Sequence, residues 1–129
     1  MIGKAIYDIL SKDPDVSAIV DTRIYPVVIE QKAAKPAIAY RKVAKTGHDT
    51  KQAASTLDKV RAEVTAVHTR YMSIQDMAEK IRRALDKKSG TFAGVTIHSS
   101  YFIDDEDEYD NEAKAYLRIL TFEFFITRN

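Results

Sequence analysis

The sequence has no cysteine among its 129 residues, which excludes disulfide bonds and thiolate catalysis and fits a reducing compartment. Glycine is scarce as well: only Gly3, Gly47, Gly90 and Gly94 occur, and they form no glycine-rich loop for a phosphate. No run of about 18 apolar residues, as a membrane helix needs, occurs. The N-terminal segment carries a charge every few residues, unlike the apolar run of a signal peptide. We therefore expect a soluble protein that is made in the cytoplasm and has no membrane partner.

The length of the chain fits one domain of 129 residues. A domain of this size buries roughly two thirds of the surface that its unfolded chain exposes, which is enough for one core without a disulfide or a metal. No internal repeat and no linker divides the sequence. We therefore expect residues 1–129 to form a single domain that needs no cofactor.

The charges are unevenly distributed, although the net charge is only +1. Seven of the 19 acidic residues lie between positions 104 and 112, where there is no basic residue. The other 12 acidic residues stand against 20 basic ones in the rest of the chain. The net charge of +1 argues against a general binder of polyanions. Because the charges are segregated, we expect one acidic loop on a basic body.

Apolar spacing predicts two short helices at the start of the chain. Apolar residues recur at helical intervals over residues 2–10. Asp13 and Pro14 then provide an N-cap and a proline at the first helical position of a second helix, over residues 14–20.

A longer helix is predicted over residues 73–88. Ser73 can cap this helix together with Asp76, and an apolar stripe runs from Ile74 to Leu85. Gly90 is expected to end the helix in a left-handed conformation.

Alternating apolar and polar residues predict the strands. Residues 24–29 read as an edge strand, because Pro26 has no N–H to donate. Further strands are expected over residues 37–45, 57–68, 95–103 and 116–127, and the last of these is apolar on both sides. The segments between them are two loops, over residues 46–56 and 104–112. This order predicts an α+β fold: a mainly antiparallel sheet with one long helix packed on a face and short N-terminal helices.

Few residues suggest catalysis. The clustered carboxylates of residues 104–112 could hold the metal ion of a nuclease, but they lack the spacing of a calcium loop, and a solvated hairpin tip is the simpler interpretation. His48, His68 and His98 have no spacing that would form a metal site. Ser99 and Ser100 are expected at exposed sheet positions rather than as nucleophiles. We therefore predict no enzyme, no catalytic residue and no bound metal.

Basic residues interleaved with tyrosine could line a path for nucleic acid, although any solvated face carries similar charges. A ring lumen through which DNA passes would give these charges a role. The residues are Arg41, Lys42, Lys45, Lys51, Arg61, Arg70, Tyr71, Arg82 and Arg83.

Five short segments in a fixed order carry a resemblance to a known family. The first two are the turn Arg23-Ile24-Tyr25-Pro26 and the proline-initiated strand Pro36-Ala37-Ile38-Ala39-Tyr40. The others are Val60-Arg61-Ala62-Glu63-Val64, Ile81-Arg82-Arg83-Ala84-Leu85 and Phe122-Glu123-Phe124. Together they span nearly the whole chain, which resembles the tail-completion proteins, or tail terminators, of long-tailed bacteriophages.

The resemblance implies a structural virion protein rather than an enzyme. Such proteins form a ring, commonly a hexamer, on the end of the tail tube, stop its polymerisation and provide the surface to which the head docks. The implied partners are further copies of the chain, the tail tube protein and the neck protein, with DNA passing through the lumen. The implied location is the junction of tail and head in a virion assembled in the bacterial cytoplasm. The alternatives are another head-tail connector or a metal-dependent nuclease that uses residues 104–112.

An assembly interface is predicted in the two loops. Clustered acids suit contact with a basic surface of a neighbouring subunit, and the long polar loop suits a segment that orders on docking. The predicted interface residues are His48, Asp49, Lys51, Asp104, Asp105, Glu106, Asp107, Glu108 and Asp110.

Overall fold

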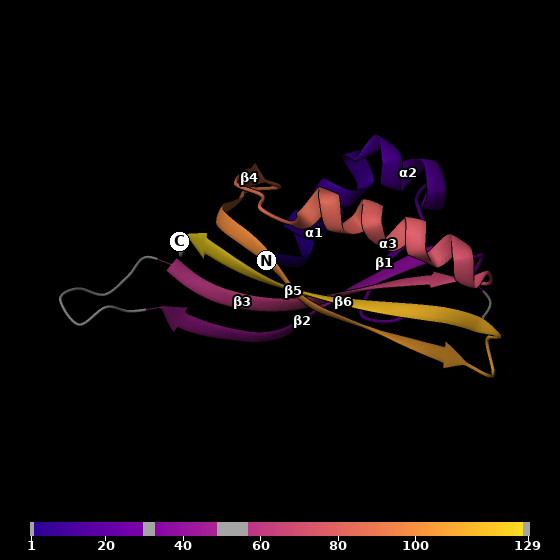
Figure 1. Ribbon diagram of the computed structural model, residues 1–129. Coiled ribbons are helices and arrows are strands. Elements are labelled where there is room, and N and C mark those ends of the chain that lie inside the picture. Colours follow the sequence, from indigo (N-terminus) through magenta and orange to yellow (C-terminus); the bar gives the residue numbers. More distant parts are fainter. Residues whose placement is uncertain (1, 30–32, 49–56, 128–129) are drawn as a thin grey trace.

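A computed structural model describes residues 2–29, 33–48 and 57–127. A curved sheet forms one layer, and all three helices of the described residues lie on one face of it (Figure 1). The opposite face, called the open face below, carries no helix in this part of the chain. The predicted mixture of helices with a mainly antiparallel sheet is confirmed, and the fold is mostly sheet.

Six strands form the sheet in the order β1-β2-β3-β6-β5-β4. β1 runs parallel to β2, and every other neighbouring pair is antiparallel. As Pro26 predicted, β1 lies at an edge. The strands are β1 (Ile24–Pro26), β2 (Ala37–His48), β3 (Leu57–His68), β4 (Gly90–Phe92), β5 (Val95–Asp110) and β6 (Ala115–Thr127).

The N-terminal helices form as their apolar spacing predicts. α1 (Ile2–Lys12) buries five apolar residues against the sheet and α3. The carboxylate of Asp13 accepts hydrogen bonds from the backbone N–H groups of Asp15 and Val16, at 3.0 and 3.1 Å. This N-cap, followed by Pro14, starts α2 (Pro14–Val20) at the predicted residue.

The core lies between the helices and the central strands. Alternate residues of β3 and β6 point toward the helices, and these residues are small in β3 and large in β6. Ala62 lies opposite Phe122, and Val60 lies opposite Phe124. All four side chains are buried, so the large rings fill the space that the small residues leave.

The third helix, α3 (Tyr71–Leu85), differs from its prediction at both ends. It begins before Ser73, and its N-cap is Arg70, which makes no side-chain cap bond. The predicted Ser73 cap is therefore wrong. The Nδ1 atom of His68 instead accepts a hydrogen bond from the backbone N–H of Arg70 at 3.0 Å, which fixes the turn that leads into the helix.

A buried serine fixes the end of α3. The hydroxyl of Ser100 donates to the carbonyl of Leu85 at 2.6 Å and accepts from the N–H of Lys88 at 2.7 Å. The helix therefore ends at Leu85, and Gly90 begins strand β4 instead of capping the helix. The expectation that Ser100 is exposed is also wrong, because its side chain is fully buried.

Strand β5 is the largest departure from the sequence prediction. It runs for 16 residues to Asp110, so most of the predicted acidic loop is extended strand. The acidic residues are held by pairing with β6, from Asp104 opposite Thr121 to Asp110 opposite Ala115. The low strand propensity of Asp and Glu is overridden here because the partner strand is strongly apolar. The short strand β4, of three residues, was also not predicted.

Ser100→Ala should lower the free energy of unfolding by about 1–3 kcal/mol, because the carbonyl of Leu85 and the N–H of Lys88 would lose their partner. Ser99→Ala, at the half-buried neighbouring position, is the matched control and should change stability by less than about 0.5 kcal/mol. Urea denaturation followed by circular dichroism measures both. Equal stability of the two variants would contradict this account of the helix end.

Candidate assembly surface

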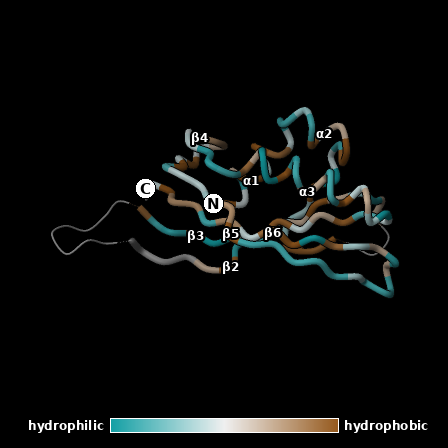
Figure 2. The backbone as a smooth tube through the Cα atoms, in the orientation of Figure 1, coloured by the Kyte–Doolittle hydropathy of each residue, from teal (hydrophilic) through white to brown (hydrophobic). Residues whose placement is uncertain are grey.

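The acidic part of β5 presents different residues on its two faces. Asp105 and Asp107 lie on the helix side, in register with Leu120 and Arg118. The remaining acids of the strand lie on the open face: Asp104, Glu106, Glu108 and Asp110. Figure 2 shows this end of β5 and the turn into β6 as a continuous hydrophilic stretch. All of these acids are exposed.

One of these acids, Asp107, forms an ion pair with Arg118. Two nitrogens of the Arg118 guanidinium donate to the carboxylate of Asp107, at 2.6 and 3.0 Å. A third guanidinium nitrogen donates to Gln75 of α3 at 2.7 Å. The side chain of Arg118 is only 13% exposed, whereas that of Asp107 is 45% exposed. No basic residue lies within residues 104–112, but Asp107 binds Arg118 of the neighbouring strand, and this arginine links β5 and β6 to α3.

This pairing changes the pKa of Asp107. The hydrogen bond from Arg118 is the main cause that lowers the pKa of the carboxyl from its ordinary 3.8, and the guanidinium charge adds to the effect, while partial burial opposes it. The same hydrogen bond raises the pKa of the Arg118 guanidinium. Asp107 therefore stays charged to lower pH than an isolated aspartate does.

Three tyrosines reinforce the same end of the sheet. The ring of Tyr116 on β6 lies 5.4 Å from that of Tyr71 on α3 and 4.9 Å from that of Tyr109 on β5. Both contacts are edge-to-face, a geometry worth about 0.5–1.5 kcal/mol for each pair. The helix, the central strand and the acidic strand are therefore joined by packing as well as by charge.

The turn between β5 and β6 is held by Asp110. Its carboxylate accepts hydrogen bonds from the backbone N–H groups of Glu112 and Ala113, at 3.0 and 3.2 Å. This side-chain bond closes the turn, as Asp commonly does. Asp110 therefore has a structural role in addition to its place in the predicted interface.

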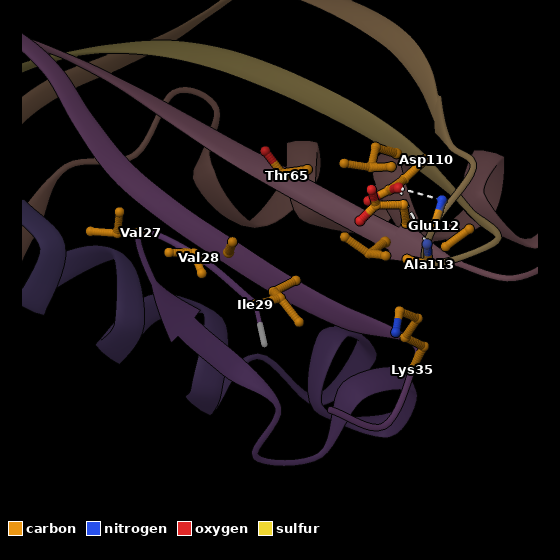
Figure 3. A pocket seen from close by; sticks show the side chains of 12 residues that line it. Val27, Val28, Ile29, Lys35, Thr65, Asp110, Glu112 and Ala113 are labelled. Carbon is orange, nitrogen blue, oxygen red and sulfur yellow. Dashed lines mark hydrogen bonds between the residues drawn. The ribbon is translucent and has the colours of Figure 1, made fainter. Parts of the chain in front are cut away.

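The open face contains a hollow of about 400 Å³ beside this turn. In Figure 3, Val27, Val28 and Ile29 lie on one side of it, and Asp110 and Glu112 lie across from them. The floor comes from β2, β3 and β6 and is mostly apolar. The other lining residues are Lys35, Ala39, Thr65, Val67, Ala113, Ala115 and Leu117.

The segment after Pro26 gives this hollow an exposed apolar wall. Val27 is 66% exposed and Val28 is 60% exposed, and Val27 has a φ of 67°. A positive φ is costly for a β-branched residue, and such strain is common at functional sites. No interface was predicted here from the sequence. The run Val27-Val28-Ile29 directly after a proline was the available signal.

The remaining residues of the predicted interface do not join the acidic strand. His48 is the last residue of β2, at the opposite end of the sheet. Asp49 and Lys51 lie outside the described residues. Of the predicted residues in the described part, only the six acids at positions 104–108 and 110 therefore lie together, on the two faces of one strand.

The basic residues proposed as a nucleic-acid path are not gathered in one place. Arg41 and Arg61 lie on the open face, where Arg41 pairs with Glu63 at 2.9 Å and Arg61 pairs with Glu123 at 2.7 Å. Arg82 lies on the helix side, 4.1 Å from the ring centre of Phe102. The sheet thus separates these charges onto two faces.

The described residues contain no cluster that could hold a metal ion. No three His, Asp or Glu side chains in residues 2–29, 33–48 and 57–127 are placed to hold a metal ion. Partial burial, and then the charge of Arg70, lower the pKa of His68, which agrees with its neutral Nδ1 accepting a hydrogen bond. Within the same ranges, no helix is long and apolar enough to cross a membrane.

Comparison with known proteins gives a family and a structural relative. Residues 4–127 match the family described as tail completion protein gp17. No curated protein sequence matches significantly. Among the solved structures that match is a chain from the virion of a native gene transfer agent particle. It superimposes with a TM-score of 0.79 at 15% sequence identity, over 95% of this chain and 92% of that one. At this identity the structural match shows a shared fold.

Asp107→Asn should reduce stability at pH 6, because the charged partner of Arg118 is lost. The carboxyl has a lowered pKa in the folded state, so its contribution is present above about pH 4 and is lost as the pH falls through the folded pKa. The stability difference between the wild type and Asp107→Asn should therefore shrink as the pH falls below about 4. Urea denaturation at several pH values measures it. Asp104→Asn is the control, and an equal effect at Asp104 would contradict the role of the Arg118 pair.

Proposed function

The chain belongs to the tail completion protein gp17 family, and from this premise we propose that it forms a ring that caps the tail tube. The sequence-based identification of the family is confirmed, and the protein is a structural component of the tail region of a phage-type virion. In the proposed role the ring, commonly a hexamer, stops tube polymerisation and provides the surface on which the head docks. The observation that carries this proposal is the family match over residues 4–127.

The proposed partners are further copies of the chain, the tail tube protein and the neck protein. Two features of the open face support contacts with other proteins. The first is the apolar hollow with the exposed Val27 and Val28. The second is formed by the half-buried Leu117, Ile119 and Phe125 on β6, which no helix in the described part of the chain covers. Apolar surface of this kind is common at protein–protein interfaces.

The acidic residues take two different roles in this proposal. Asp107 and Asp110 hold the hairpin through Arg118 and the turn amides. Asp104, Asp105, Glu106 and Glu108 are exposed and are proposed to meet a basic partner surface. Such complementary charges set register and partner choice more than affinity.

Assembly of tails without the protein tests the role. In a phage or prophage that lacks this gene, we expect tubes longer than normal and filled heads without tails, because nothing caps the tube. Addition of the purified protein should restore tube length and joining, as counted by electron microscopy. Tubes of normal length that nevertheless fail to join heads would contradict termination and indicate another connector.

The control uses a variant of the apolar wall. Val27→Lys with Val28→Lys should fold normally, because both side chains are mostly exposed, but it should fail to restore tube length if the hollow contacts the tube. Full rescue by this variant would exclude the hollow from the tube interface. Circular dichroism melting curves establish that the variant is folded.

A further inference from the structure

The sheet has two incomplete edges, one at each side. On one side, β1 pairs with β2 only over Ile38 to Tyr40, and the N–H of Val27 adds one bond to the carbonyl of Tyr40. On the other side, β4 pairs with β5 only over Val95 to Ile97. No other described strand covers the outer edge of β2 over residues 41–48 or that of β5 over residues 103–110.

These two edges have opposite charge. Asp86 and Lys87, between α3 and β4, bond to the backbone of Phe102 and Ser100, so the uncovered part of β5 begins at Ile103. Each spans eight residues, or about 26 Å of strand. Residues 103–110, called the acidic edge, contain six acids and no base. Residues 41–48, called the basic edge, contain Arg41, Lys42 and Lys45 and no acid. Each begins beside a β-bulge, at Ile103 and at Val43, and both bulged side chains are 44% exposed.

An uncovered strand edge is a template for another strand, because its outward N–H and C=O groups have no partner in the sheet. Charge on an edge often serves only to prevent such pairing. Two edges of opposite charge on one chain can instead select which edges pair. Like edges repel each other, whereas the acidic edge of one chain attracts the basic edge of another.

We propose that copies of this chain join through these edges, the acidic edge of one copy pairing with the basic edge of the next. The proposal rests on the ring proposed above and identifies its subunit contact. The strand directions permit it: β2, β3, β6 and β5 are successively antiparallel, so β2 and β5 run in opposite directions. Continuing the sheet into a second copy therefore creates another antiparallel pair.

The short strands β1 and β4 set the stagger of this contact. When the register is followed across the sheet, the acidic edge aligns with the stretch of β2 that pairs with β1. The basic edge aligns with the half of β5 that ends in the stretch paired with β4. Neighbouring copies must therefore be displaced along the strands by roughly half a strand. In a closed assembly, such a stagger means strands that tilt against the ring axis, as in β-barrels. Each contact joins two different surfaces, which is the arrangement that builds rings.

Charge-reversal variants of each edge provide the test. One variant carries Asp104→Lys, Asp105→Lys, Glu106→Lys and Glu108→Lys, which change the net charge of its acidic edge from −6 to +2, so that both of its edges are basic. The other carries Lys42→Glu and Lys45→Glu, so that both are acidic. We expect each variant alone to need a concentration about tenfold or more above that of the wild type for assembly, because like charges oppose each other. An equimolar mixture should assemble like the wild type, with the two variants alternating. Light scattering after size exclusion, with and without tail tubes, measures assembly.

The control reverses acids on the helices, away from both edges: Asp15→Lys with Glu79→Lys should assemble normally. Amide hydrogen exchange adds a readout of strand pairing, since peptides covering both edges should exchange at least about tenfold more slowly in the assembly. If a reversal variant unfolds, Glu106→Gln with Glu108→Gln replaces it and should weaken assembly at low salt.

The outcomes separate this contact from the ring itself. Normal assembly of both single variants, or a mixture that fails like its components, would overturn the edge contact while leaving the ring proposal in place. A wild-type protein that forms no oligomer alone or on tail tubes would overturn both. Exchange that is unchanged at both edges in a fully assembled ring would also exclude edge pairing.

Discussion

The pairing of β3 with β6 is the constraint on which the rest of the structure depends. Twelve residues of each strand are in register, from Leu57 opposite Thr127 to His68 opposite Tyr116. This register places small residues of β3 beside large ones of β6 under the helices, as for Ala62 and Phe122. A shift by one residue would turn every one of these side chains to the other face. The helices, the outer strands and both proposed surfaces take their positions from this pair.

The same pairing decides where the protein can interact. β6 is apolar on both sides, so filling the core under the helices leaves Leu117, Ile119 and Phe125 on the open face. The clustered acidic residues lie on the neighbouring strand β5. One of them, Asp107, binds Arg118, which also donates to Gln75 in the N-terminal half of α3. The braced hairpin end and the apolar residues of the open face fit the contacts with other proteins that are proposed above.

The residues that sequence reasoning placed correctly are those whose signal is local. The Asp13 cap, the proline at the start of α2 and the alternation in β3 each depend on neighbours in the chain. The errors concern residues whose partners are distant in the sequence. Ser100 looked like an exposed strand residue, but it ends α3 from 15 positions away. The acids of β5 looked like a loop because Asp and Glu disfavour strands, whereas their pairing with β6 decides otherwise.

The sequence by itself determined the helices and central strands, the family and the presence of a concentrated acidic segment. The elements and the acidic segment follow from periodicity, capping residues and composition, which act over a few positions, and the family follows from the resemblance of five short segments in a fixed order. Only the tertiary structure decided that this segment is a strand edge, that Arg118 neutralises one of its acids, and that Val27 and Val28 wall a hollow with the β5–β6 turn. Those facts depend on which distant strands become neighbours, and that choice is made by the packing of the whole core, to which each residue contributes only a part.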